Sequence, residues 1–266
     1  MLEKIDAWLF GLFNALAGRS WALDTLIDLP LTNNLVKAGV IGACFLFAWH
    51  QTEDEAATRR RREVLLIAVA ASIVTLGITQ PLGHAIFHPR PFIAAQEHFR
   101  WDGQGLEKAP PLAFREPLVG DTHRDLAGLR AGVTSENDLS SFPSDHAGFF
   151  FTLALGVWLA CRRAGLVAFG WTLVFILSPR IIMGQHWPLD IAAGAAIGSG
   201  VLAALHFALH RKARSVHDPV VDWTMRHSAL ATALIFLFLA AAVNALADVR
   251  DGMGVAKDLA KYWTGA

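Results

Sequence analysis

Two histidines stand beside other ionisable residues in a pattern that favours phosphoryl transfer. His186 precedes Asp190 by four residues, so in a helical turn the carboxylate can hydrogen-bond one ring nitrogen and direct the other toward a substrate. An imidazole held in this way is a candidate nucleophile for phosphorus. His146 belongs to a different segment and is the candidate general acid for the leaving group.

The candidate phosphate ligands are two arginines and the start of a helix. Arg90 and Arg180 carry planar guanidinium groups, each of which matches two phosphate oxygens. Ser144, Asp145 and His146 stand at a predicted helix start, where unpaired backbone N–H groups favour an anion. The sequence therefore predicts a phosphate site formed by Arg90, Arg180, Ser144 and Asp145.

Each of these residues also has a purely structural explanation. Arg90 could extend from a membrane span to the interface, and Asp190 could cap the helix that follows it. Ser144 or Asp145 could cap the helix that contains His146. A phosphoryl-transfer site is favoured only because all these residues occur together in one chain.

The chain that must position these residues is strongly apolar. Of its 266 residues, 54% are hydrophobic and 17% are charged, against about 45–50% and about 25% in soluble domains. Six apolar blocks approach the length of about 20 residues that crosses a bilayer as a helix. The blocks cover residues 35–50, 64–82, 146–161, 166–183, 190–209 and 228–247. We expect an all-α fold, a polytopic membrane helix bundle with about six transmembrane helices in a single domain of residues 1–266.

The distribution of basic residues predicts how the bundle is oriented. The 23 basic and 23 acidic residues cancel, which argues against a nucleic-acid partner. Basic residues gather in three connections, 59–62, 162–163 and 211–226, and cytoplasmic loops are enriched in them. The alternation of spans then places all the candidate site residues on the opposite, non-cytoplasmic face.

Two further segments complete the predicted layout. Apolar residues at helical spacing over 5–16 predict an N-terminal helix in the membrane interface, or else an ordinary packed helix. Residues 92–142 form a predicted extracytoplasmic loop, in which Trp101, Phe114 and the prolines at 110–111 either cover the headgroup pocket or belong to a variable surface.

Small residues in the fifth span permit close contact between helices. Gly194 and Gly198 are four residues apart, a spacing that suits packing within the bundle or contact with a second copy.

Three segments together resemble the signature of the type 2 phosphatidic acid phosphatase (PAP2) superfamily. The first is Arg90-Pro91. The second is Phe-Pro-Ser-Asp-His-Ala over residues 142–147. The third is Arg180, followed six residues later by His186 and ten residues later by Asp190. The signature region spans about residues 83–194, and with the pattern of spans the resemblance covers about 35–210.

The resemblance implies a reaction and a role for each residue. His186 would attack phosphorus to form a phosphohistidine, Asp190 would orient it, and His146 would protonate the leaving group. Arg90, Arg180 and Ser144 would hold the phosphate. No metal or other cofactor is implied, which suits a reaction driven by positioning and charge stabilisation.

The sequence departs from the family pattern at three positions. Gly83 stands where the family usually has Lys, and His84 or His88 could replace part of its charge. Asp145 stands where Gly is commonest, and Pro179 where Ser is usual.

The missing Lys and the Pro-Ser-Asp-His form resemble a bacterial branch that acts on undecaprenyl diphosphate. This implies a polyprenyl diphosphate substrate, with a site that faces the periplasm or exterior of a bacterial cytoplasmic membrane.

Three other interpretations remain open at this point. A lipid phosphotransferase would use the same site and pass the phosphate to another lipid. A lipid or solute transporter would use the charged residues only to line a path. A metal site would draw on the His84, His88, His146 and His186 imidazoles with Asp145 and Asp190.

Overall fold

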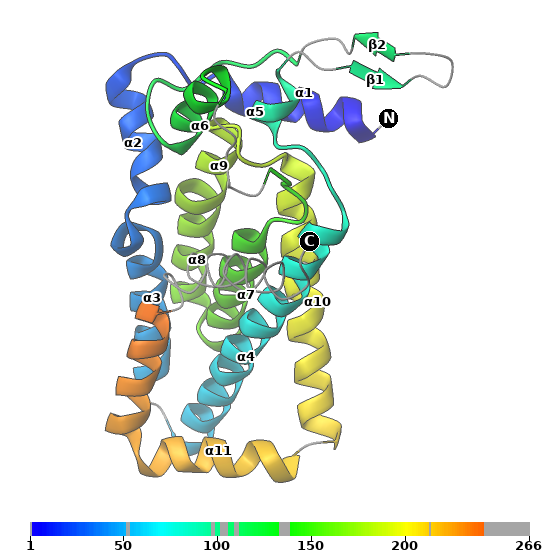
Figure 1. Cartoon of the computed structure of the whole chain (residues 1–266). Coiled ribbons are helices and arrows are strands. Elements are labelled where there is room, and N and C mark those ends of the chain that lie inside the picture. Colours follow the sequence, from blue (N-terminus) through cyan, green and yellow to red (C-terminus); the bar gives the residue numbers. More distant parts are fainter. Residues whose placement is uncertain are drawn as a thin grey trace, which may run out of the picture.

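The computed structural model describes residues 2–51, 54–96, 99–101, 106–108, 112–132, 139–212 and 214–241. Within them the chain forms a helical bundle with one short antiparallel hairpin, β1 (Phe99–Trp101) and β2 (Leu106–Lys108) (Figure 1). The all-α class predicted from the sequence is confirmed. The end of the last apolar block and the two prolines at 110–111 lie outside the described residues, as does the side chain of Trp101.

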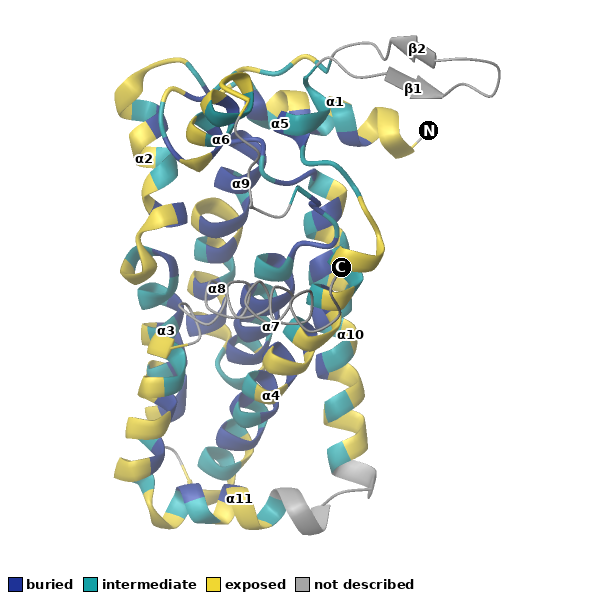
Figure 2. Ribbon diagram, viewed as in Figure 1, coloured by how far each residue is buried: buried dark blue, intermediate teal, exposed yellow. Residues whose placement is uncertain are grey.

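Helix α7 (Asp145–Ala160) lies at the centre and packs against α4 (Glu55–Ala85), α8 (Arg162–Trp171) and α10 (Pro188–Lys212) (Figure 2). Glycine permits this close approach. A Cβ built on Gly156 would overlap Ala68 of α4, and one built on Gly198 would overlap the hydroxyl of Thr152. The predicted helix contact through Gly194 and Gly198 is confirmed as packing within the bundle, because Gly194 lies equally close to Ser144.

Several elements are bent or irregular. Helices α2 (Trp21–Thr32) and α3 (Asn34–His50) meet at an angle of 60°. Helix α8 continues through a π-helical turn, Thr172–Leu177, into the short α9 (Ser178–Ile182). Helix α11 (Arg214–Arg226) turns by 110° into a further helix, Ser228–Ala241.

The apolar helices make this a multi-pass membrane protein. Three helices, Glu55–Ala85, Arg162–Ile182 and Pro188–Leu209, are long and apolar enough to span a bilayer, and the two bent pairs raise the number to five. Helix α7 is apolar but shorter. Over the described residues all six predicted blocks coincide with helices, but length and composition support three to five spans there, so the predicted number of six is not confirmed.

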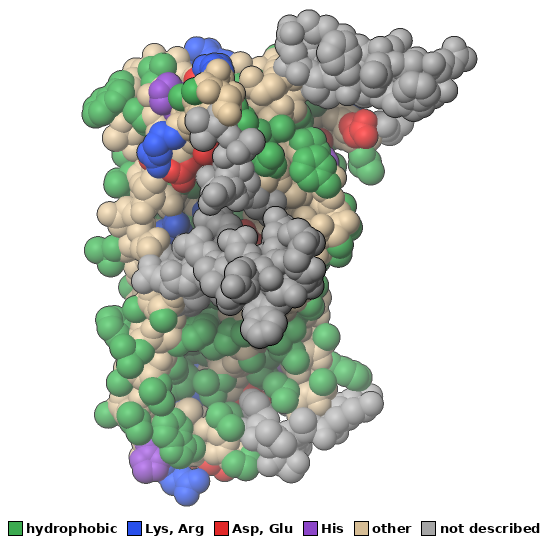
Figure 3. Space-filling view, viewed as in Figure 1, with side chains coloured by type: hydrophobic (Ala, Val, Ile, Leu, Met, Phe, Trp, Pro, Cys, Tyr) green, Lys and Arg blue, Asp and Glu red, His purple; other side chains and the backbone are tan. Residues whose placement is uncertain are grey.

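Basic residues of separate connections gather at one end of the bundle. Arg59 of α4 pairs with Asp218 and Asp222 of α11, which lies across this end (Figure 1). The neighbouring Arg62 donates to the backbone carbonyl of Thr224. On the face shown in Figure 3, apolar side chains cover the sides of the bundle and charged ones lie nearer its two ends.

Helix α1 (Leu2–Asn14) lies across the opposite end of the bundle, near α5 (Pro91–Ala94) and α6 (Asp121–Arg130) (Figure 1). Ile5, Trp8 and Leu12 point outward and Phe10 is buried, an arrangement that suits an interfacial helix. Phe114 of the long loop stacks on Phe10 with ring centroids 6.3 Å apart.

Candidate active site

A cavity of about 430 Å³ opens among α3, α4, α7 and α9. Five of the seven predicted site residues line it: Arg90, Asp145, His146, Arg180 and His186. The structure therefore brings together side chains from three segments that are well separated in the sequence. Ser144 and Asp190 lie behind this lining, and Phe114 is not part of it.

Backbone pairing places the first two sequence motifs side by side. The N–H of Arg90 donates to the carbonyl of Leu139, and that of Ser141 donates to the carbonyl of His88. Pro89 and Ser140 form the bridge between these two antiparallel segments. Arg90 is thereby fixed directly before α5, at its N-cap position, and the first residue of α5 is a proline that suits a helix start.

The third motif lies on a tight turn between α9 and α10. Gly184 adopts a φ of +77°, a left-handed conformation that favours glycine. The N–H groups of Gln185 and His186 both donate to the carbonyl of Arg180, so the turn folds back on the arginine. Asn14 of α1 holds it from outside by donating to the carbonyl of Ile182.

The His186 imidazole is buried, with 4% of the residue exposed. Its Nδ1 lies 2.9 Å from the carbonyl oxygen of Ser141. A carbonyl only accepts, so Nδ1 carries the proton and Nε2 keeps its lone pair. Burial, reinforced by the positive charges of Arg90 and Arg180, holds the pKa of His186 well below its usual value. The neutral, nucleophilic form therefore prevails at neutral pH.

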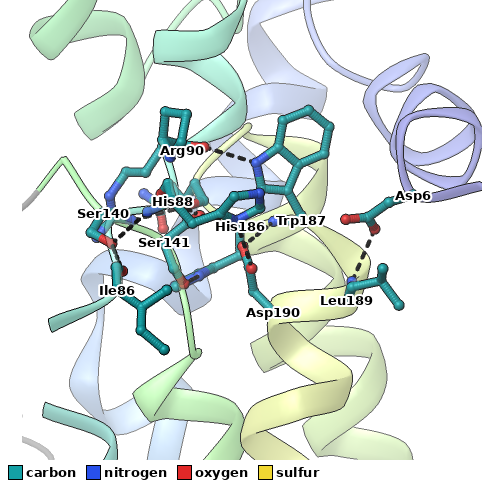
Figure 4. A network of polar contacts seen from close by, with 12 residues as sticks. Asp6, Ile86, His88, Arg90, Ser140, Ser141, His186, Trp187, Leu189 and Asp190 are labelled. Atoms are coloured by element: carbon teal, nitrogen blue, oxygen red, sulfur yellow. Dashed lines mark hydrogen bonds and ion pairs between the residues drawn. The ribbon is translucent and has the colours of Figure 1, made fainter. Parts of the chain in front are cut away.

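Asp190 does not contact His186 as the spacing predicted. One carboxylate oxygen accepts from the backbone N–H of Trp187 at 2.9 Å, and the other lies 3.0 Å from Nδ1 of His88 (Figure 4). The first contact closes the start of α10, which is the structural alternative considered for this residue. The carbonyl of Ser141, in the loop before α7, accepts the hydrogen bond from Nδ1 of His186 that was expected to go to the Asp190 carboxylate.

His88 is half-exposed beside this carboxylate, with 41% of its side chain accessible. Its hydrogen bond to Asp190 raises the pKa of His88 above the usual value. On the far side of α10's first turn, a carboxylate oxygen of Asp6 accepts from the N–H of Leu189 (Figure 4). Asp190 thus belongs to a network that fixes the His186 turn.

Gln185 connects the two arginines. Nη1 of Arg90 donates to its backbone carbonyl at 3.0 Å, and Nη1 of Arg180 donates to its side-chain Oε1 at 3.2 Å. Arg180 is buried and follows the π-helical turn and Pro179; π-helical turns occur frequently at functional sites. Both guanidinium groups line the cavity from the side of the His186 turn.

His146 is the second residue of α7 and is paired with Asp145, the first. The Nδ1 of His146 lies 2.7 Å from a carboxylate oxygen of Asp145, and Gln80 donates to the other oxygen at 3.1 Å. This carboxylate is therefore directed at an imidazole and an amide, which suits orienting His146 better than binding an anion. A carboxylate–histidine pair does exist in the site, but at His146 and not at His186.

Ser144 is fully buried and caps α7. Its hydroxyl accepts from the N–H of Ala147, and its own N–H donates to the carbonyl of Asp190. The structure therefore shows the capping contact, the structural alternative for this residue, and ties the start of α7 to the start of α10.

Several cavity residues have no counterpart in the sequence-based prediction. Thr79, Gln80, Gln185 and Lys37 all line the cavity, and the carbonyl of Ser141 holds the His186 imidazole. Lys37 and Gln80 are polar residues inside apolar helices, a signal that identifies functional positions in membrane proteins. The other residues carry no such signal, because they lie in loops or are common in helices.

The residues considered for a metal site are dispersed. Among the residues that the structure describes, no three His, Cys, Asp or Glu side chains lie close enough together to hold a metal ion. His84 is exposed at the end of α4 and does not line the cavity.

Comparison with known proteins places this geometry in a family. A model of the PAP2 superfamily matches residues 64–214. The chain is 27% identical over 207 residues to YbjG of Escherichia coli, which is described as a candidate undecaprenyl-diphosphatase. The aligned region covers 77% of this chain and 83% of YbjG. The lipid A 1-diphosphate synthase of Escherichia coli is 28% identical over 72% of this chain and 70% of its own.

A shorter match, 43% identical over 68 residues, is to BcrC of Bacillus licheniformis, named a bacitracin transport permease protein. It covers 25% of this chain and 31% of BcrC. No solved structure matches. The family match covers more than half of the chain and contains all seven predicted site residues. This chain therefore belongs to the PAP2 superfamily and is a multi-pass membrane hydrolase of phosphoric esters, a lipid phosphatase.

Proposed function

We propose that the chain hydrolyses a lipid diphosphate, with a polyprenyl diphosphate favoured, through a phosphohistidine on His186. The observation that carries this proposal is the imidazole of His186. Its Nδ1 donates to the Ser141 carbonyl, and its Nε2 therefore keeps a lone pair within a cavity that Arg90 and Arg180 also line. Such a nucleophile beside two cations fits an incoming phosphate.

In the first step the lone pair of Nε2 of His186 attacks the terminal phosphorus. A P–N bond forms and the P–O bond to the leaving lipid phosphate breaks, while protonated His146 gives its Nε2 proton to the leaving oxygen. Arg90 and Arg180 stabilise the charge on the oxygens of the transferred group. Asp145 positions His146 through the hydrogen bond to its Nδ1.

In the second step water attacks the phosphohistidine. His146, now neutral, takes a proton from the water as the O–P bond forms, and the electrons of the P–N bond return to Nε2 of His186. Inorganic phosphate leaves, and both histidines regain their starting protonation. Ser144 and Asp190 act as positioning residues, because they join the starts of α7 and α10 behind the site.

The substrate and the location rest on the relatives and on charge. YbjG is described as a candidate undecaprenyl-diphosphatase, and its alignment covers 77% of this chain. This similarity supports a polyprenyl diphosphate as the substrate here. The basic connections lie at one end of the bundle and the cavity lies toward the other, so the positive-inside rule favours a bacterial cytoplasmic membrane with the site facing the periplasm or exterior.

Phosphate release by detergent-purified protein tests the proposal. The substrates are undecaprenyl diphosphate, phosphatidic acid, phosphatidylglycerol phosphate and lipid A. We expect the highest kcat/KM on the first of these, and no turnover by His186→Ala. His84→Ala is the matched control, since this histidine is exposed outside the cavity, and it should retain wild-type activity. Normal phosphate release by folded His186→Ala would contradict the mechanism.

A second candidate function is transfer of the phosphate to another lipid. It is favoured by the similarity to a lipid A 1-diphosphate synthase over 72% of this chain. The chemistry differs only in the group that attacks the phosphohistidine. Mass spectrometry of the lipids after incubation with both undecaprenyl diphosphate and lipid A distinguishes the two, since only transfer creates a lipid with an added phosphate.

A further inference from the structure

Three ionisable residues that line the cavity are not used by the mechanism above: Asp121, Asp125 and Lys37, of which only Lys37 is basic. It lies in the first turn of α3, just after the 60° bend from α2. Lys37 lines the same cavity as Arg90, Arg180 and the two catalytic histidines, although α3 carries none of the sequence motifs. Only 7% of the residue is exposed.

A buried lysine in this helix needs a physical reason. Helix α3 contains no Asp, Glu or Arg, and its remaining residues are mostly apolar. A buried ammonium is costly unless polar or negatively charged groups surround it. Nζ of Lys37 donates to Oδ1 of Asn34 at 3.3 Å, and a second side chain of this cavity wall, that of Thr79, is buried with no protein hydrogen-bond partner for its hydroxyl. The ammonium of Lys37 and the hydroxyl of Thr79 therefore make this wall of the cavity suited to a polar ligand.

The facing helix offers no cation of its own at this level. Gly83 of α4 lines the cavity, and a Cβ built on it would stand 3.3 Å from the carbonyl oxygen of Phe142. His84 is exposed, and His88 is engaged by Asp190. A Cβ at position 83 would require the loop carbonyl to shift by a few tenths of an ångström, whereas Lys37 lines the cavity from α3 without such a conflict.

Building on the proposed function, we propose that Lys37 is a substrate-binding residue that holds the second phosphate of a lipid diphosphate. The arginines lie on the side of His186 and bind the phosphate that is transferred. Lys37 enters from another helix and meets the phosphate that stays with the lipid. A single phosphate carries about −1.5 to −2 charge at neutral pH, which two arginines balance, so a third cation matters most when a second phosphate is present.

The test compares a diphosphate and a monophosphate of the same lipid, farnesyl diphosphate and farnesyl phosphate. Lys37→Met should lower kcat/KM on the diphosphate by about 10- to 100-fold, since it removes a hydrogen bond to a charged group. Activity on the monophosphate should change by less than about threefold. Lys37→Arg should recover most of the loss. The control is Lys4→Met, which removes an exposed lysine of α1. An equal loss on both substrates, or no loss on either, would overturn the assignment.

A second measurement uses only the wild-type protein. An amine-reactive reagent is applied with and without inorganic diphosphate, and modification of each lysine is read by mass spectrometry. Inorganic diphosphate should protect Lys37 and leave Lys4 unprotected, and equal modification of Lys37 in both samples would overturn the inference. This readout does not depend on turnover, so absence of lipid hydrolysis would count against the proposed function alone.

Discussion

Replacing Arg180 with lysine isolates the geometric contribution of its guanidinium group. The residue is buried, donates to Gln185 across the His186 turn and lines the cavity. Lysine preserves the positive charge but offers a compact ammonium in place of a planar fork. The variant therefore removes paired hydrogen bonding to phosphate and keeps the electrostatic attraction.

The size of the effect follows from the number of hydrogen bonds lost. A fork that binds two phosphate oxygens loses at least one charge-assisted hydrogen bond, and such bonds contribute about 1.5–3 kcal/mol. Since about 1.36 kcal/mol corresponds to a factor of ten, kcat/KM should fall about 10- to 150-fold. Most of the loss should be in kcat, because the charge on the oxygens develops in the transition state.

The assay is steady-state phosphate release from farnesyl diphosphate in detergent, with thermal unfolding measured alongside. Arg130→Lys is the matched control, because Arg130 forms a two-point pair with Glu116 that is exposed and outside the cavity. That variant should stay within about twofold of wild type, as exposed pairs contribute little. A kcat/KM for Arg180→Lys within about threefold of wild type would refute the bidentate role.

Three further predictions follow from contacts already described. His146→Ala should lower kcat by about 10²- to 10⁴-fold on lipid substrates and much less on an aryl phosphate, whose leaving group needs no proton, and equal losses on both would contradict its role as acid. Gly198→Leu should lower the unfolding temperature, since overpacking costs about 1–3 kcal/mol, whereas Gly200→Leu, with open space around it, should not. The raised pKa of His88 means that its pairing with Asp190 stabilises the fold fully below the unfolded pKa of about 6.5 and less as the pH rises through the folded pKa. His88→Gln should flatten thermal stability over that range, and an unchanged profile would show that the pair is not coupled to folding.

Chain-wide hydropathy and motif spacing were sufficient to predict the bundle and five of the polar side chains that line the cavity. Apolar blocks identify helices because every backbone polar group in a bilayer must be satisfied within the helix. The alternation of spans then places Arg90, His146 and Arg180 near one another. The bends between α2 and α3 and within the last pair alter the number of spans, and bends of this kind depend on packing that single-sequence patterns do not describe.

The hydrogen-bond partners inside the site were predicted less well. The four-residue spacing of His186 and Asp190 assumed a continuous helix, but α10 begins at Pro188, so the histidine stands on a turn. The loop carbonyl of Ser141 can then reach it. A backbone carbonyl has no sequence signal. Lys37 does have one, as a charged residue inside an apolar helix, but it lies outside the three motifs.

The contacts of helix α1 determine how late in synthesis the His186 turn can be completed. Asp6 accepts from the N–H of Leu189 and Asn14 donates to the carbonyl of Ile182, contacts that span 183 and 168 residues of sequence. These two contacts can form only after residues 182–189 have been synthesised. The turn that carries His186 therefore gains the support of α1 only after most of the chain has been made.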